Sequence, residues 1–190
     1  MKTVLLLPGF NEGLHSRDYN KTIKTIESRN YKVKFVAISW LRTTANDWVE
    51  QLEKTYKNYK TANTILAGFS YGAVTAFVAA SRHNPSELWL FSLSPRFHED
   101  MPNLPKSTIN QIGKRRLAAF NNLIFSTAAK NIKCKTLIFV GGTESKKDPA
   151  LLKRAKSANK LIVSSTLVSM PDVPHDISDK NYLKAIEQNI

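Results

Sequence analysis

Short apolar runs that alternate with longer amphipathic stretches are the feature that most restricts how this chain can fold. The apolar runs lie at Val4–Leu7, Val33–Ile38, Thr64–Phe69, Leu88–Leu93 and Thr136–Val140, with a weaker one at either Leu161–Val163 or Thr166–Val168. Most of them are too apolar to alternate between a buried and a solvated face, which is typical of strands covered on both sides. Helical patterns separate them, at Tyr19–Ser28, Thr44–Tyr59, Tyr71–Ser81, Ser107–Lys130, Pro149–Ala158 and Asp179–Gln188. This alternation predicts an α/β fold: a three-layer sandwich with an open, mostly parallel sheet of about six strands.

The length of the chain fits one domain. Its 190 residues are 42% hydrophobic and 23% charged, and a chain of this size can bury a core without metal or disulfide help. We expect a single domain over residues 1–190, in which residues 95–130 form a short, largely helical, lid-like connection. The one cysteine, Cys134, lies beside an apolar run and is expected to be a packed thiol.

The N-terminal apolar run is interrupted by Pro8 and Gly9 soon after it begins. A secretory signal needs about 7–15 apolar residues, and a membrane span about 18. We therefore expect no signal peptide, no membrane span and a cytoplasmic location.

The formal net charge is +13. The densest basic cluster, Lys114–Arg116, is short and lacks the interleaved aromatic residues of RNA-binding motifs, so we expect no specific nucleic-acid binding. Two interpretations of the charge stay open: a generally lysine-rich surface, or attraction of an acidic partner or substrate such as an acyl carrier or a coenzyme A thioester.

The sequence Gly68-Phe69-Ser70-Tyr71-Gly72 matches the pattern G-x-S-x-G and lies between an apolar run and a helical stretch. In such a motif the serine occupies a strained turn from strand to helix, where larger neighbours would collide. The pattern predicts that Ser70 is a nucleophile. The simpler alternative is a helix start with Ser70 as its N-cap.

A serine hydroxyl is a weak nucleophile and needs a base within hydrogen-bond reach. His175 follows the last predicted strand, near the final helix, and is favoured as that base. His83 lies at the end of the helix after Ser70, where a capping role fits better. His15 and His98 lie in loops after strands and remain candidates for the pocket.

The base in turn needs a carboxylate that holds its tautomer. Glu144 lies close to the end of the fifth apolar run and is favoured. Asp148 directly precedes Pro149 and a helical stretch, the pattern of an N-cap aspartate, but it stays an alternative, as does Asp172.

An acyl-transfer site also needs donors for the oxyanion. We expect these to be the backbone N–H groups of Tyr71 and Phe10, with Gly9 allowing close approach of the chain and Asn11 beside them. The remaining expected boundaries of the pocket are Arg96, Phe97, His98 and part of 107–130. Arg96 fits either recognition of an acidic substrate end or an ordinary solvated position.

Together these motifs resemble those of the α/β-hydrolase superfamily over nearly the whole chain. The matching segments are "PGF" after the first run, "GFSYG", "SLSP", "VGGTE" and "PHDI", and the order Ser70, acid, His175 is the one that this superfamily uses. The resemblance implies a minimal α/β-hydrolase fold with its acid after the penultimate strand, which supports Glu144. It also implies that the first hairpin of the larger family sheet is missing. Pro8 stands where many relatives have histidine, which bears on the second oxyanion donor.

The function expected from these residues is hydrolysis of a small-molecule carboxylic ester or thioester, through an acyl-enzyme on Ser70 with His175 as general base. We expect no metal and no organic cofactor. Two alternatives stay open: acyl transfer or lyase chemistry on the same scaffold, and a catalytically silent protein with a binding or regulatory role.

Overall fold

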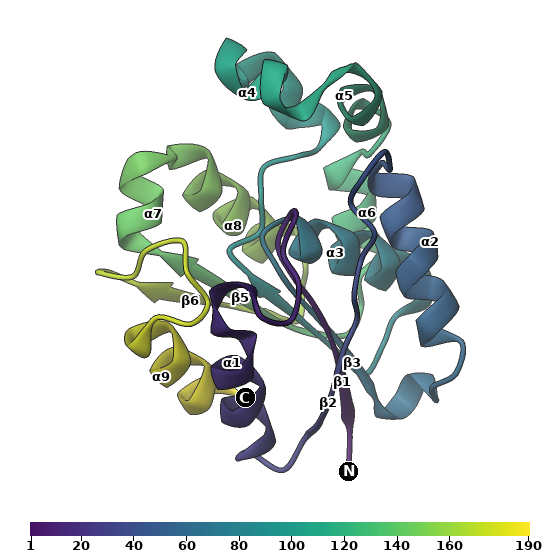
Figure 1. Cartoon of the computed structure of the whole chain (residues 1–190), viewed down its shortest axis with the longest axis vertical. Helices are drawn as coiled ribbons and strands as arrows, with labels where there is room; N and C mark the ends of the chain where they lie inside the picture. Colours follow the sequence, from purple (N-terminus) through teal and green to yellow (C-terminus); the bar gives the residue numbers. More distant parts are fainter.

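Six strands form one open sheet in the order β2-β1-β3-β4-β5-β6, and every neighbouring pair is parallel (Figure 1). The structure is a computed structural model that describes residues 1–190 apart from the side chain of Arg17. The strands are β1 (Thr3–Leu7), β2 (Lys32–Phe35), β3 (Thr64–Phe69), β4 (Glu87–Phe91), β5 (Lys135–Gly141) and β6 (Ser165–Met170). The predicted α/β architecture with an open, parallel sheet is confirmed.

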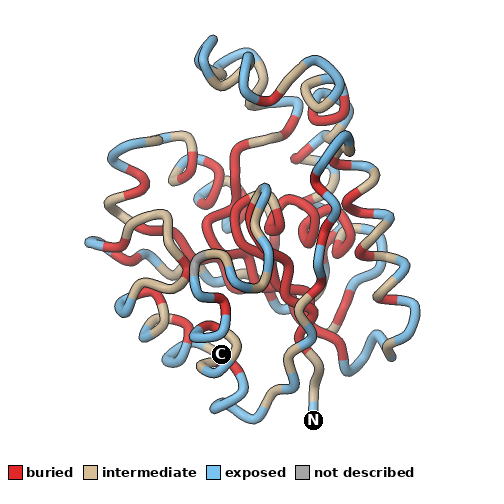
Figure 2. The backbone as a smooth tube through the Cα atoms, in the orientation of Figure 1, coloured by how far each residue is buried: buried red, intermediate tan, exposed pale blue. Residues whose placement is uncertain are grey.

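Helices cover both faces of the sheet and enclose two separate hydrophobic clusters. One face carries α2 (Ala45–Tyr56), α3 (Tyr71–His83), α6 (Phe125–Asn131) and α8 (Pro149–Leu161). The other face carries α1 (Tyr19–Glu27) and α9 (Lys180–Asn189), which lie side by side in Figure 1. Figure 2 shows the four central strands, β1, β3, β4 and β5, as the buried centre between these two layers, whereas most residues of the edge strands β2 and β6 are half-buried or exposed. The fold is therefore a three-layer sandwich.

The connections that leave the neighbouring parallel strands β1 and β3 run toward opposite edges of the sheet. The chain leaves β1 for β2 on one side and leaves β3 for β4 on the other. Such a reversal opens a crevice outside the carboxyl ends of the two strands, where parallel sheets place their ligands. The residues that follow β1 and β3 are 8–11 and Ser70, so the topology brings both predicted segments to this crevice.

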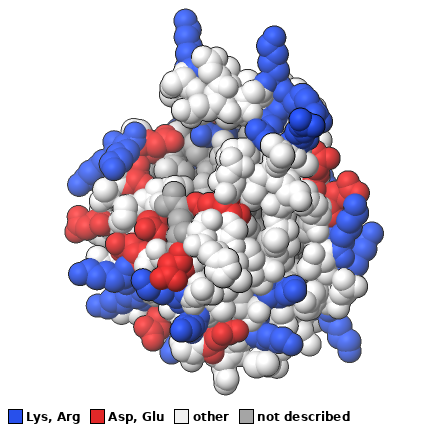
Figure 3. All heavy atoms as spheres, in the orientation of Figure 1, with Lys and Arg blue, Asp and Glu red and all other residues white. Residues whose placement is uncertain are grey.

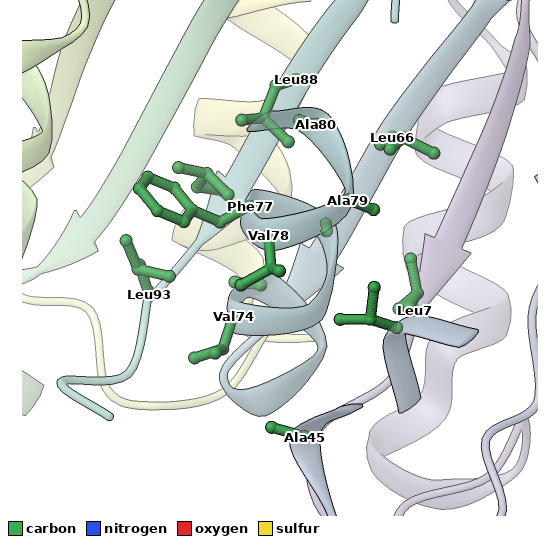
Figure 4. Packing of buried hydrophobic residues seen from close by; sticks show 14 of the residues in the cluster. Leu7, Ala45, Leu66, Val74, Phe77, Val78, Ala79, Ala80, Leu88 and Leu93 are labelled. Atoms are coloured by element: carbon green, nitrogen blue, oxygen red, sulfur yellow. The ribbon is translucent and has the colours of Figure 1, made fainter. Parts of the chain in front are cut away.

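Helix α3 is the most deeply buried helix next to this crevice. Its residues from Gly72 to Ala80 are all buried, and Figure 4 shows its apolar side chains among those of the strands and the neighbouring helices. Phe77 of α3 stacks on Phe125 of α6, with ring centroids 5.0 Å apart. Full burial of one such large apolar side chain contributes about 1.5–3 kcal/mol to folding. The first turn of α3 is therefore held rigidly against the sheet.

The segment expected as one helix over Ser107–Lys130 is broken into three. It contains α4 (Lys106–Ile112), α5 (Lys114–Asn121) and α6, and a 3-10 helix, η3 (His98–Asn103), precedes it. The first break falls at Gly113, whose φ of +82° is left-handed and ends a helix. Helices α4 and α5 rise above the rest of the molecule (Figure 1), and most of their residues are exposed or half-buried (Figure 2).

Other predicted boundaries also change. The choice of Leu161–Val163 as the last strand is wrong, because Leu161 ends α8 and Val163 is exposed, whereas Thr166–Val168 lies within β6. The second and fourth apolar runs continue beyond their strands, since β2 ends at Phe35 and β4 at Phe91. A short helix, α7 (Gly142–Lys147), follows β5 directly, where the sequence patterns predicted no helix. Within the part of the chain that is described, no helix has the length and apolar character that crossing a membrane requires.

Candidate active site

Ser70 occupies the sharp turn between β3 and α3. Its backbone angles, φ 57° and ψ −114°, are strained for a residue with a side chain. The Ser70 N–H donates to the carbonyl of Phe91 at 2.9 Å, and its carbonyl accepts from the N–H groups of Ala73 and Val74. Because the sheet holds one side of the residue and the helix holds the other, the strain persists and the hydroxyl is fixed at the edge of the sheet.

The two glycines of the motif allow three backbones to meet at this turn. A Cβ atom on Gly68 would lie 2.2 Å from the carbonyl oxygen of Gly72, and one on Gly72 would lie 2.3 Å from that of Pro8. Both distances are far inside van der Waals contact, and the neighbouring atoms are backbone. The glycines therefore let the segment after β1 pack directly against the first turn of α3.

His175 reaches Ser70 from the loop between β6 and α9. Its Nε2 atom lies 3.0 Å from Ser70 Oγ. The loop is held by the buried side chains of Val173 and Ile177 on either side of His175, and the imidazole lies against the ring of Phe69 at a centroid distance of 4.7 Å. The His175 side chain is 34% exposed, so the ring is accessible and yet fixed in orientation.

Glu144 lies behind His175, in the first turn of α7. Its Oε2 atom is 2.5 Å from His175 Nδ1, and its Oε1 atom accepts from the N–H of Gly141 at 2.6 Å and from the hydroxyl of Ser92 at 2.7 Å. Because an ionised carboxylate only accepts hydrogen bonds, the imidazole proton lies on Nδ1. Nε2 then accepts the hydrogen bond of the Ser70 hydroxyl.

The alternative acids lie elsewhere. Asp148 accepts from the N–H of Ala150 at 3.1 Å and caps α8, as the sequence indicated. Asp172 is exposed in the loop before His175. The carboxylate that the structure brings to His175 is therefore that of Glu144.

The other three histidines lie apart from Ser70. His83 is at the opposite end of α3, with Nε2 2.9 Å from a carboxylate oxygen of Glu53. His98 Nδ1 donates to the carbonyl of Asn121 at 2.9 Å, and His15 is exposed.

Three hydroxyl groups near the site were not singled out from the sequence. Ser94 Oγ lies 3.1 Å from Ser70 Oγ, and Ser92, which bonds to Glu144, has its own hydroxyl 3.0 Å from that of Tyr182. Because the single proton of Ser70 points to His175, the hydroxyl of Ser94 donates in its contact with Ser70. Both serines follow β4 in "SLSP", and their position at the carboxyl end of a strand was the signal available. Tyr182 has no comparable signal, since it falls on the apolar face of α9.

The segment after β1 places Phe10 close to Tyr71, the residue that follows Ser70. The rings of Phe10 and Tyr71 are 5.2 Å apart. Among the described residues, neither the backbone N–H of Phe10 nor that of Tyr71, the first residue of α3, has an acceptor. Two such N–H groups are available to a ligand.

Gly9 and Asn11 are not part of this pair of available N–H groups, although both lie in the same loop as Phe10. The N–H of Gly9 is already used, since it donates to Glu12 Oε2 at 3.0 Å and to the hydroxyl of Tyr19 at 2.9 Å. Asn11 is exposed and has a left-handed φ of 59°. These two residues shape the loop.

A cavity of about 510 Å³ opens over Ser70 and His175, a size typical of small-molecule sites. Its lining includes Tyr71, Ser94 and Arg96, together with residues of α7 and the His175 loop. Phe97 and His98, which were expected at its boundary, do not line it, because Phe97 is fully buried against Phe77 and His98 bonds to Asn121. The expectation that Phe10, Asn11 and part of 107–130 bound this cavity is also wrong, since none of them is among the described residues that line it. Within the described part of the chain, no three His, Cys, Asp or Glu side chains form a group suited to a metal ion.

The sequence matches no protein-family model and no curated protein. Its structure resembles Est1E from Butyrivibrio proteoclasticus, with a TM-score of 0.83, 12% sequence identity, and coverage of 98% of this chain and 86% of that one. It also resembles MenH from S. aureus (TM-score 0.70, 20% identity, 99% and 95% coverage). A third match is a lipase-esterase related protein from Clostridium acetobutylicum (TM-score 0.71, 15% identity, 100% and 94% coverage). The chain has the α/β-hydrolase fold, as the motifs implied.

The close approach at the Ser70 turn predicts a large effect of one added methyl group. Gly68→Ala should lower the free energy of unfolding by at least about 2 kcal/mol, because its Cβ meets rigid backbone. Gly13→Ala is the matched control, since a Cβ there has no atom within 4 Å, and its effect should stay within about 0.5 kcal/mol. Urea denaturation measures both; equal stabilities for the two variants would contradict the close packing.

The buried hydroxyl of Tyr182 predicts a specific pH dependence. Burial, reinforced by the charge of Glu144, raises the pKa of this phenol well above its ordinary value. In the unfolded chain Tyr182 has an ordinary pKa of ~10 and loses its proton at a lower pH than in the folded protein. The free energy of unfolding of the wild type therefore falls as the pH rises above about 10. Tyr182→Phe should be less stable by about 1 kcal/mol at pH 8, through loss of the bond to Ser92. That deficit should shrink above about pH 10; a deficit that stays constant in thermal unfolding across this range would refute the account.

Proposed function

We propose that the protein is a serine hydrolase that cleaves a carboxylic ester or thioester, with Ser70 as nucleophile, His175 as general base and Glu144 as the acid that orients His175. The observation that carries this proposal is the unbroken chain of contacts from Ser70 Oγ to His175 Nε2, 3.0 Å, and from His175 Nδ1 to Glu144 Oε2, 2.5 Å. These three side chains lie at the carboxyl edge of the sheet and line a cavity.

In the first step Ser70 Oγ attacks the carbonyl carbon of the substrate while its proton passes to His175 Nε2. The tetrahedral intermediate then collapses: the bond from carbon to the leaving oxygen or sulfur breaks, and His175 gives the proton to that atom. The alcohol or thiol departs, and an ester to Ser70 remains. Glu144 stabilises the positive imidazolium that exists between the two proton transfers.

In the second step water attacks the acyl carbon and its proton passes to His175 Nε2. The bond to Ser70 Oγ breaks, His175 returns the proton to that oxygen, and a carboxylic acid leaves. Ester and thioester substrates fit this site because their leaving groups need less assistance than the nitrogen of an amide.

The oxyanion formed in both steps needs donors. We assign this role to the backbone N–H groups of Phe10 and Tyr71, which have no acceptor in the described part of the protein. Loss of one such donor costs other hydrolases about 2.7–4 kcal/mol of transition-state stabilisation. Gly9 and Asn11 support the loop that presents Phe10.

We further propose that residues 95–130 act as a lid within a single domain. Arg116 of α5 donates to the carbonyls of Trp40 and Thr43, at 2.8 and 3.0 Å, and its guanidinium lies 4.8 Å from the centre of the Phe10 ring. These contacts join the raised helices to the segment beside Ser70.

The fold likeness supports a carboxylic acid as product. Est1E has been solved with ferulic acid bound, and ferulic acid is a carboxylic acid, the class of product that ester hydrolysis releases.

The test of the nucleophile is Ser70→Ala. The wild type should react with a fluorophosphonate probe and hydrolyse p-nitrophenyl esters, and the variant should do neither, because the attacking oxygen is gone. Ser145→Ala is the matched control: this buried serine of α7 bonds to the carbonyl of Gly141 and lies outside the proposed triad. Labelling of the wild type without turnover of any ester or thioester would favour acyl transfer, lyase chemistry or a silent binding protein instead.

The test of the acid compares two neighbouring carboxylates. Glu144→Gln should lower kcat by about 10⁴-fold, as loss of the orienting acid does in a serine protease. Asp148→Asn changes a cap of α8 and should lower kcat by less than about threefold. A larger loss from Asp148→Asn, measured with the same ester, would overturn the assignment of Glu144.

A further inference from the structure

A second cavity of about 450 Å³ adjoins the one over Ser70. The two share part of their lining, contributed by Pro95, Arg96, Lys147 and Asp148. The second cavity extends away from the nucleophile, between the start of α8 and the chain from η3 to α4. Apolar residues there, Leu104 and Pro105, give room for a hydrocarbon segment. A substrate whose carbonyl lies at Ser70 can therefore extend past Arg96.

Arg96 is held in a fixed orientation where the two cavities meet. Its Nε atom donates to the hydroxyl of Tyr71 at 2.9 Å, and its Nη1 atom donates to the carbonyl of Pro95 at 2.9 Å. Nη2 has no acceptor, and the guanidinium has no carboxylate partner, among the described residues. Because these hydrogen bonds already fix the side chain, binding an anion costs little further conformational entropy.

The charge around the second cavity is positive. Its cations are Arg96, Lys147 and Lys153, none of which forms an ion pair with a described residue. Each of its two carboxylates, Asp100 and Asp148, has a hydrogen-bond donor, but only Asp100 has a cationic partner among the described residues.

Asp100 pairs with the buried Arg154, and Asp148 caps α8. On the face seen in Figure 3, Lys and Arg side chains extend from the α4–α5 region and from the region of α7, and the surface between the two is recessed, with Asp or Glu atoms beside it. In the described part of the chain, three cations without an ion-pair partner face one carboxylate without one, Asp148, so an anionic group entering there meets a net positive charge.

We propose that this second cavity is a subsite for a carboxylate at the far end of the substrate, bound by Arg96 and assisted by Lys147. The inference rests on the proposed hydrolase function and defines its substrate class: a monoester or monothioester of a dicarboxylic acid. The planar guanidinium matches a carboxylate through two parallel hydrogen bonds, which a lysine cannot offer. The scissile carbonyl lies at Ser70, and the acyl chain extends past Pro95 to the subsite.

The test compares two esters of equal length, monomethyl adipate and methyl hexanoate, which differ in having a carboxylate or a methyl group at the far end. The wild type should show kcat/KM at least about tenfold higher for monomethyl adipate, since a hydrogen-bonded charge discriminates by about that factor or more. Arg96→Gln should bring the ratio of the two kcat/KM values close to one. Arg96→Lys should fall between, and added salt should lower the wild-type ratio.

Lys160→Gln is the matched control. It removes one positive charge from the exposed end of α8, outside both cavities, and should leave both kcat/KM values unchanged. A wild-type ratio near one, with methyl hexanoate hydrolysed, would overturn the subsite and leave the hydrolase function intact. A ratio that Arg96→Gln does not change would also overturn it.

A binding measurement separates failure of the subsite from failure of the function. If the wild type hydrolyses neither methyl ester and no p-nitrophenyl ester, the proposed function fails. The subsite is then judged by thermal unfolding with adipate, with hexanoate as the control ligand. A rise in the Tm of the wild type with adipate but not with hexanoate, and no such rise in Arg96→Gln, would support the subsite. No rise in Tm with adipate would reject it.

Discussion

The buried carboxylate of Glu144 is the constraint on which the geometry of this site depends. A charge removed from water is tolerated only when donors surround it. Here the donors come from three parts of the chain: the N–H of Gly141 after β5, the hydroxyl of Ser92 after β4, and Nδ1 of His175 after β6. Satisfying Glu144 therefore fixes the ring of His175, and the ring turns its other nitrogen to Ser70.

A second constraint acts on Ser70, the proposed nucleophile. The backbones around Gly68, Gly72 and Pro8 lie so close that only glycine fits at the first two positions. This contact brings the end of β1 to the end of β3 at the point where the direction of chain connection reverses. The strain at Ser70 is stored in a place where the sheet and the buried helix α3 both resist its release. Folding thus prepares the site before any ligand arrives.

Much of this arrangement could be predicted from the sequence because it depends on local pattern. Apolar runs identified the strands, and the candidate catalytic residues Ser70, Glu144 and His175 were expected where those runs end, which is where the structure has them. The failures have physical causes. Amphipathic periodicity predicted one helix where Gly113 separates two. After β5, where no helix was predicted, Glu144 accepts the N–H of Gly141 and caps the short helix α7.

Contacts between distant elements were not predictable. Nothing in the pattern shows that Ser94 meets Ser70 or that Tyr182 reaches Ser92. The state of Arg96, fixed by Tyr71 and without a carboxylate partner, also depends on the tertiary fold. The excess of positive charge is visible in the sequence, but only the structure shows that part of it lines a cavity that adjoins the one over Ser70.

The central claim is that Ser70 carries the acyl group during turnover. The most direct measurement is acid quenching of the protein within the first turnovers of p-nitrophenyl acetate, followed by peptide mass spectrometry. The account predicts one acetyl group, on the peptide that contains Ser70. Ester hydrolysis with no acetyl group on that peptide, or with the acetyl group on another residue, would contradict it.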